Sequence, residues 1–430
     1  MVINDYRQST VRLEERGTRI SLEEILYFTG LVLWLAQFYM SRTIYADFYS
    51  GKLPTAVRYF CMLIFMIKIV LTEKTIERKA SAVVLTAAAV FIVVQRNINT
   101  GMPLIQALLL IYGARNISFR RICKVLFWSC VVLWTTPVLL DRIGIHSVSR
   151  EVYRERVREY LNFNYVSYAA IYFNNILFCG LYAFTDPDRE GTGGNYAKRR
   201  EVPWLMLVFL AAMEIWIYVI TDTSLPFAVG LLCLFLYVIV IKLRAPVLNN
   251  NAFNRIAAVV VFPVMAIATY RLCLVYTSKN KLLKKFNDLT HNRVALANQG
   301  LKKYGVHLFG IQIKENTDMS KGDYFYIDSG YMKNLINYGL IVLIIILVYY
   351  SIILYAAIIE RDKVLAIWLI CIAIYSAFNN LLLSPTESGS FLAFWYALDL
   401  IKWHRRKRHK PGIRSSIGSK RRRIEYGAES

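Results

Sequence analysis

Long apolar segments dominate the chain. From Ile25 onward, runs of roughly 14 to 28 residues carry few charged side chains and alternate with polar connections. Because an α-helix rises 1.5 Å per residue, about 20 apolar residues cross the hydrocarbon core of a bilayer. We therefore predict about twelve transmembrane helices, at 25–40, 55–71, 80–95, 99–113, 122–141, 165–184, 203–220, 225–243, 256–276, 331–358, 364–382 and 390–403.

Composition supports the same class. Of the 430 residues, 56% are hydrophobic and only 19% are charged, whereas soluble domains have about 25% charged residues. The net charge of +23 would suggest nucleic acid in a soluble protein, but in membrane proteins Lys and Arg collect on the cytoplasmic side. We expect an all-α polytopic membrane protein that binds no nucleic acid. Residues 1–403 would form one transmembrane domain, and 404–430 a basic tail attracted to anionic membrane lipid.

The distribution of Lys and Arg predicts the orientation. With the N-terminus inside, the inside segments hold thirty-one of these residues, and the short outside loops hold only Arg42, Lys52 and Arg96. Short loops that carry positive charge stay in the cytoplasm. Both termini are therefore predicted to be cytoplasmic.

Two outside segments depart from this pattern. Residues 141–164 contain five arginines interleaved with glutamates, and residues 277–330 contain nine Lys or Arg. Guanidinium groups bind phosphate through two parallel hydrogen bonds, so a cationic outer surface between apolar helices suits a lipid-linked anionic substrate. The segments are predicted to be two functional external loops.

A structural alternative applies to the first of these loops. Glu151 and Glu155, like Arg154 and Arg158, stand four residues apart, a spacing that places side chains on one face of a helix. The loop could therefore be an amphipathic surface helix with a solvated face.

Ionisable residues inside the predicted spans are candidates for function, because a charge in the bilayer is costly. Glu214 lies well within one span, and we expect it to face the bundle interior and pair with Arg271 or with an amide such as Asn174. Arg58 and Lys68 lie nearer span ends, where long side chains can reach the interface by snorkelling.

Motifs of soluble enzymes are missing. The sequence has no HExxH, no GxSxG, no phosphate-loop lysine, and no acidic pair in an external loop that would hold a nucleotide sugar through a metal ion. The seven cysteines include no CxxC pair. We expect neither a metal nor a cofactor.

Three stretches carry a family resemblance. Residues 292–310, with Asn292-Arg293 and Tyr304-Gly305 through Leu308-Phe309-Gly310, and residues 327–341, with Asp328-Ser329-Gly330-Tyr331, resemble motifs of the Wzy-type bacterial polysaccharide repeat-unit polymerases. Residues 158–167 are similar to an earlier motif of that family. The wider superfamily includes the O-antigen ligases.

The resemblance implies a glycosyltransferase of the bacterial cytoplasmic membrane that makes O-antigen, capsule or exopolysaccharide. Its substrate would be undecaprenyl-diphosphate-linked oligosaccharide, and its partners a flippase and a chain-length regulator. At the outer face, a hydroxyl of one repeat unit would attack the anomeric carbon of another with inversion, and the lipid diphosphate would leave.

This chemistry suggests roles for individual residues. Arg158 and Arg293 would stabilise the departing diphosphate, since fixed cations act most strongly on charge that develops in the transition state. Asp328 would accept the proton of the attacking hydroxyl, although it could instead be the N-cap of the helix entered at Tyr331. Further candidate substrate-binding residues are Arg154, His291, His307, Tyr331, Glu214 and Arg271.

Two other functions remain open. A ligase of the same superfamily would transfer the glycan once to a different acceptor. A carrier, such as a flippase of lipid-linked sugars, could also have about twelve spans with both ends inside, but the chain lacks the internal repeats usual in carriers.

Overall fold

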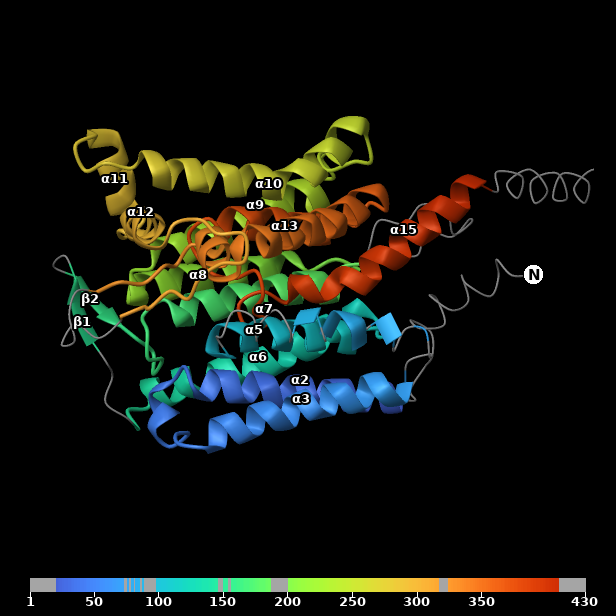
Figure 1. Ribbon diagram of the computed structural model, residues 1–430, viewed down its shortest axis with the longest axis horizontal. Helices are drawn as coiled ribbons and strands as arrows, with labels where there is room; N and C mark the ends of the chain where they lie inside the picture. The colour runs from blue at the N-terminus through green and yellow to red at the C-terminus, as the bar shows by residue number, and fades with distance from the viewer. Residues whose placement is uncertain are drawn as a thin grey trace, which may run out of the picture.

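The fold is a bundle of long helices (Figure 1). The computed structural model describes residues 21–72, 98–145, 150–153, 156–186, 200–316 and 324–409, with short helical pieces between 76 and 88. The principal helices are α2 (Leu22–Met40), α3 (Leu53–Thr72), α5 (Ile98–Gly113), α6 (Phe119–Arg142), α7 (Tyr168–Phe184), α8 (Trp204–Thr221), α9 (Ser224–Tyr237), α10 (Ala252–Val275), α13 (Gly330–Ile359), α14 (Lys363–Tyr375) and α15 (Phe394–His409). Shorter elements are the 3-10 helices η1 (Ile44–Asp47) and η4 (Gly389–Ala393), the π-helix η2 (Val238–Lys242), helices α11 (Lys281–Leu289) and α12 (Arg293–Tyr304), and strands β1 (Arg150–Tyr153) and β2 (Arg156–Glu159).

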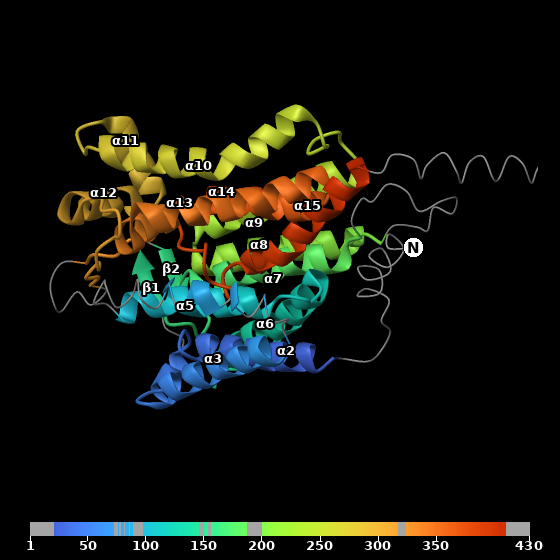
Figure 2. The ribbon, with the colours of Figure 1, turned by 45° about the vertical axis from the view of Figure 1, so that its right-hand side comes forward.

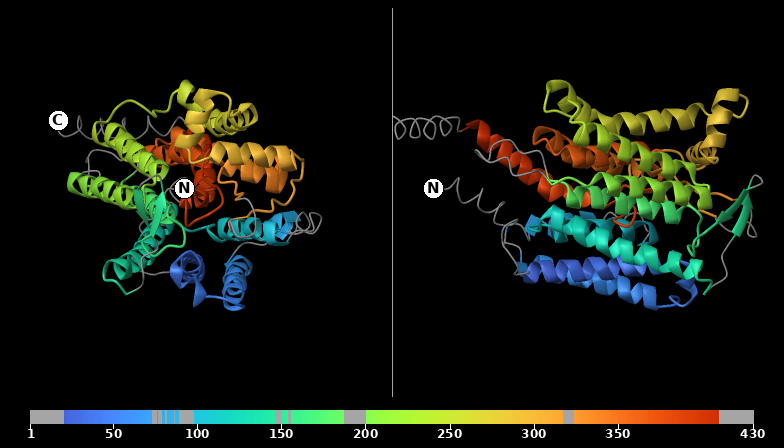
Figure 3. Two further views of the ribbon diagram at one scale, coloured as in Figure 1. Left: turned by 90° about the vertical axis from the view of Figure 1, so that its left-hand side faces the viewer. Right: turned by 180° about the vertical axis from the view of Figure 1, so that it is seen from behind.

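The long helices run side by side along the longest axis of the molecule. Strands β1 and β2 and helices α11 and α12 gather at one end, which we call the outer end (Figures 1 and 3). Helix α2 begins and α15 finishes at the opposite, inner end (Figure 2). Both segments predicted to be external therefore lie at the same end of the bundle.

Six of the described helices, α3, α6, α8, α9 with η2, α10 and α13, are long and apolar enough to cross a membrane. Large apolar side chains are exposed along their flanks, among them Leu205 (82%) and Val219 (71%) of α8. Such broad exposed apolar surface is unfavourable in water and is accommodated by lipid. The chain is a helical membrane protein, and its described residues include one small hairpin. The third predicted span, 80–95, lies mostly outside the described residues.

Helix α14 occupies the centre of the bundle. After Lys363 its residues are apolar on every face, and nearly all of them are buried, including Leu365, Ile372 and Tyr375. A helix that is hydrophobic all round requires protein on every side. Because α14 is central, the irregular connection 376–388 that follows it also lies inside the assembly, with several polar residues fully buried.

The first external loop forms a β-hairpin, so the surface-helix interpretation is wrong. Strands β1 and β2 are antiparallel, with Val152 opposite Val157 and Glu151 opposite Arg158. β-Branched pairs and opposite charges across two strands stabilise a hairpin. The alternation of Arg and Glu also places residues of the same charge four positions apart, which is the spacing of residues on one face of a helix. Arg154 and Glu155 lie outside the described residues.

A kink in α13 receives the second external loop. Gly339 has non-helical φ/ψ values of 86° and 174°, and Gly310 of the loop has a φ of 76°. A Cβ on Gly339 would lie 2.3 Å from the backbone nitrogen of Gly310, so both positions require glycine. The Leu340 N–H, which the kink removes from the helical ladder, donates to the His307 carbonyl (3.0 Å). Two stretches that carry the family resemblance thus meet.

Candidate functional site

A cavity of about 950 Å³ lies among the helices toward the outer end. Its wall comes from the end of α2, the first turns of α3, α7 and α13, the middle of α5, and the connection after α14. The second external loop contributes residues from 313–315 and 324–328. The charged lining residues are Arg42, Arg58, Lys333, Glu315, Asp328 and Glu387, and the tyrosines are Tyr165, Tyr168, Tyr324, Tyr326 and Tyr338. The cavity therefore combines both signs of charge with aromatic surface.

Asp328 and Arg293, two of the three predicted catalytic residues, lie together. The Arg293 Nε is 3.4 Å from Asp328 Oδ2, and the Arg293 side chain is only 6% exposed. Tyr165 of the first loop lies beside the guanidinium. Burial raises the pKa of Asp328, although Arg293 and Lys333 oppose this effect. Asp328 lines the cavity, whereas Arg293 is not a lining residue and contacts Asp328.

The alternative role for Asp328 as a helix cap is wrong. Helix α13 begins at Gly330, and its N-cap is Ser329, whose hydroxyl accepts a hydrogen bond from the Met332 N–H (3.4 Å). The Asp328 carboxylate is consequently available to face the cavity.

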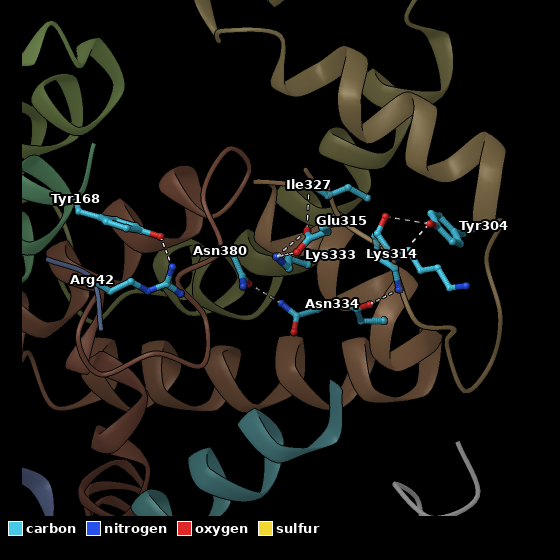
Figure 4. A network of polar contacts seen from close by, with 11 residues as sticks. Arg42, Tyr168, Tyr304, Lys314, Glu315, Ile327, Lys333, Asn334 and Asn380 are labelled. Atoms are coloured by element: carbon cyan, nitrogen blue, oxygen red, sulfur yellow. Dashed lines mark hydrogen bonds and ion pairs between the residues drawn. The ribbon is translucent and has the colours of Figure 1, made fainter. Parts of the chain in front are cut away.

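Arg42 supplies a cation from the end of α2. Its Nη1 donates to the Tyr168 hydroxyl (2.5 Å) (Figure 4). The guanidinium lies 5.1 Å from the centre of the Tyr168 ring and 5.2 Å from the centre of the Phe38 ring. The Arg42 carbonyl accepts a hydrogen bond from the Asn164 N–H (3.0 Å). Residues of the first loop therefore position the first turn after α2.

Lys333 supplies a second cation from the first turn of α13. Its Nζ lies 2.8 Å from Glu315 Oε1 and 4.1 Å from the centre of the Tyr326 ring. Glu315 also accepts a hydrogen bond from the Ile327 N–H (3.3 Å), which ties the loop to the helix (Figure 4).

Glu387 supplies a further carboxylate from the connection between α14 and η4. It lines the cavity and is half-buried. Burial raises the pKa of Glu387 to about 7, with the positive charges of Arg42 and Lys333 acting in the opposite direction and Asp328 in the same one. A carboxyl group that changes charge near neutral pH thus faces the cavity.

Arg158, the third predicted catalytic residue, points elsewhere. Its Nη2 donates to the Asp222 carbonyl (3.0 Å) and its Nε lies 3.6 Å from Asp222 Oδ2, at the turn between α8 and α9. Arg156 pairs with the same carboxylate (2.9 Å). Arg158 is not among the lining residues of the cavity. Its geometry anchors the hairpin to the bundle.

The predicted substrate-binding residues of the second loop also lie off the cavity lining. Tyr331 is fully buried and donates its hydroxyl to the Ala373 carbonyl (2.8 Å), which fixes α13 against α14. A ring nitrogen of exposed His307 lies 2.8 Å from the Tyr304 carbonyl. His291 occupies a left-handed backbone position before α12.

Glu214 is buried as predicted, at 1% exposure, but the ion pair with Arg271 is wrong because Arg271 is exposed. The neighbouring polar group is Asn174. A Cβ on Gly230 would lie 2.3 Å from Glu214 Oε1 and 2.7 Å from Asn174 Oδ1. Glycine at 230 therefore leaves room for both side chains between α7, α8 and α9, but among the described residues no hydrogen bond joins Glu214 to Asn174, so the predicted pairing is not formed.

The two residues assigned to snorkelling lie in different surroundings. Lys68 is fully buried, and its Nζ donates to the Arg115 carbonyl (2.8 Å) after the end of α5. Snorkelling is thus wrong for Lys68. Arg58 of α3 lines the cavity.

Arg42, Lys333 and Glu387 were not selected from the sequence. Arg42 did carry a signal, because it is one of only three basic residues in short outside loops. Lys333 stands within the stretch 327–341 that resembles the polymerases. Glu387 lies in Ser-Pro-Thr-Glu-Ser-Gly, which has the composition of an ordinary turn, so the sequence around it gave no signal of a functional role.

Chemically, fixed cations, cavity carboxylates and tyrosine faces together suit a sugar that carries a phosphate group. Neither a protein family model, a curated protein sequence nor a solved structure matches this chain.

Proposed function

We propose that the chain polymerises undecaprenyl-diphosphate-linked oligosaccharide repeat units at the outer face of the bacterial cytoplasmic membrane. The reaction is an inverting, metal-independent glycosyl transfer. The observation that supports this proposal is the cavity of about 950 Å³ toward the outer end, where segments resembling the polymerases contribute Asp328, Lys333 and Tyr165 to the lining.

The cavity cations suit the leaving group. When the bond between the anomeric carbon and the diphosphate breaks, negative charge grows on the phosphate oxygens, and preorganised cations stabilise that charge more than they stabilise the ground state. Arg42 and Lys333 reach the cavity directly. Arg293 acts through Asp328, which it holds in place.

The cavity carboxylates suit the nucleophile. A sugar hydroxyl attacks effectively only if its proton is removed as the new bond forms, and a carboxylate within hydrogen-bond reach can accept it. Asp328 and Glu387 both face the cavity. Inversion needs no covalent intermediate, so two groups, a base and a phosphate clamp, are sufficient.

A single assay tests the proposal. Source cells that lack this chain should accumulate lipid-linked repeat units, which can be extracted, radiolabelled and incubated with the purified protein in detergent or liposomes. A ladder of lipid-linked products supports polymerisation. One transfer to a different acceptor would identify a ligase, and movement across liposomes without a new bond would identify a carrier.

A further inference from the structure

The connection that carries Glu387 is held by a buried amide. Asn175, in the middle of α7 and fully buried, donates its Nδ2 to the carbonyls of Pro385 (2.8 Å) and Thr386 (3.2 Å). Its Oδ1 accepts the N–H of Gly389 (3.1 Å). One side chain thus satisfies three backbone groups on both sides of Glu387.

The connection is also stiffened internally. The Ser388 N–H donates to the Ser384 carbonyl (2.7 Å), and the hydroxyls of Ser384 and Thr386 lie 2.8 Å apart. A buried amide in an apolar helix is unfavourable unless its hydrogen bonds are made. Asn175 makes them with this connection, which fixes the backbone position of Glu387.

The carboxylate of Glu387 remains open to the cavity. Within the described part of the chain it has no hydrogen-bond or ion-pair partner, and it lines the cavity wall. Charged or titratable groups that interact with it electrostatically are Arg42, Lys333, Asp328, Tyr168, Tyr172, Tyr326 and Tyr375. Asp328 differs, because the buried Arg293 holds one of its oxygens. Of these two carboxylates, Glu387 is the less constrained.

We propose that Glu387 is the catalytic base of the glycosyl transfer and that Asn175 is a positioning residue acting through it. This proposal rests on the proposed function. The acceptor hydroxyl oxygen forms a bond to the anomeric carbon and gives its proton to the Glu387 carboxylate. The carbon–oxygen bond to the diphosphate breaks, and its electron pair leaves with the lipid diphosphate. Glu387 then returns the proton to water.

Glu387→Gln tests the assignment, because it keeps the shape and removes the base. Using the lipid-linked repeat unit described above, we expect kcat to fall at least about 100-fold, the scale of general base catalysis, with KM changed less. Glu387→Asp should retain more activity. Glu360→Gln, which removes a carboxylate at the inner end, is the matched control and should keep wild-type kcat.

The pH profile gives a second readout. A base must be deprotonated, so wild-type kcat/KM, which reports the pKa of groups in the free protein, should rise with pH and level off above the raised pKa of Glu387, about 7. Asp328→Asn should lower the rate but retain this acid limb. If Asp328→Asn removes the limb while Glu387→Gln retains both limb and rate, Asp328 is the base and the proposal is wrong.

Asn175 has a matched control in its neighbour. Asn174 is equally buried in α7, but its Nδ2 donates to the Pro226 carbonyl (2.8 Å), away from Glu387. We expect Asn175→Ser to lower kcat and shift the acid limb, and Asn174→Ser to leave the limb unchanged. Equal pH profiles in the two variants would overturn the positioning role.

Failure of this proposal differs from failure of the proposed function. If the wild-type protein makes no ladder, polymerisation itself is refuted. If it makes a ladder and folded Glu387→Gln makes the same ladder at the same rate, only the assignment of the base is refuted. Size-exclusion chromatography and thermal unfolding in detergent establish that each variant is folded.

Discussion

The two ends of the bundle differ in how their charged side chains are paired. At the inner end, ion pairs tie separate elements together, such as Arg121–Glu24 (2.6 Å), Arg120–Asp186 (2.6 Å) and Lys242–Glu201 (3.3 Å). In the cavity toward the outer end, Arg42 and Glu387 face the same space, and neither has an ion-pair partner among the residues that the structure describes.

The difference separates charges that hold the fold from charges left for a ligand. A position at the outer end does not by itself leave a charge for a ligand, because the hairpin arginines Arg156 and Arg158 are paired with Asp222. A partly buried charge without a partner lowers the stability of the fold, so a charged side chain in such a place indicates a function. Arg42 and Glu387 are therefore cavity charges that depart from full pairing, whereas Lys333 is paired with Glu315 and Asp328 with Arg293.

Loss of Arg293 should have the largest effect. Arg293→Ala leaves Asp328 buried without its cation, and breaking a buried pair costs about 3–5 kcal/mol. We expect polymer formation to be lost and the thermal unfolding midpoint in detergent to fall. Arg293→Lys should be intermediate in both measurements, since Lys keeps the charge but not the planar guanidinium.

The double variant Arg293→Met, Asp328→Asn isolates the cause. With both charges removed, much of the lost stability should return while polymer formation stays low. If Arg293→Ala unfolds at the wild-type temperature, the pair does not stabilise the fold, and the predicted cost of breaking it is refuted.

Arg42 should come next. Arg42→Ala removes a cavity cation whose positioning depends on Tyr168 and Asn164, and we expect kcat/KM for the lipid-linked repeat unit to fall about 10- to 100-fold. Lys52→Ala, at an exposed position in the same connection, is the matched control and should behave as wild type. Equal activity of the two variants would show that Arg42 does not contact substrate.

The helices were largely predictable, because a bilayer fixes their length and apolar character. The beginning of α2 is also visible in the sequence, where Ser21 and Glu24 form a capping box. The sequence does not show that Arg293 and Asp328 are in contact, although the family resemblance selected both residues as candidates. The kink at Gly339 and its fit to Gly310 depend on tertiary contact between two distant glycines.

The remainder of the site depends on contacts between distant segments. Nothing near Glu387 in the sequence shows that Asn175, more than 200 residues earlier, holds its backbone. Likewise, five arginines in 141–164 look equivalent until Asp222 binds two of them. Local pattern identifies residue types that suit a reaction, whereas the bundle decides which of them reach the cavity.

Arg158 should have a smaller effect than Arg42. Arg158→Ala leaves Arg156 paired with Asp222, so the hairpin keeps one anchor, and the cavity lining is unchanged. We expect polymer yield to fall only a few-fold in the ladder assay, with the acid limb of kcat/KM retained. A loss as deep as that of Arg42→Ala would place Arg158 in the substrate site after all.

Glu24→Gln should have the smallest effect, and on stability alone. Gln at this position can still complete the capping box with Ser21, so the substitution removes the charge that pairs with Arg121 and preserves the helix start. Because the Arg121 side chain is 31% exposed, the pair is partly solvated and should contribute about 0.5–1 kcal/mol. We expect a small drop in the unfolding midpoint relative to wild type, and this drop should become smaller at high salt, which screens the pair. Both kcat and KM should be unchanged. A change in kcat would mean that the inner-end pairs communicate with the cavity, and the division between structural and functional charges would then have to be abandoned.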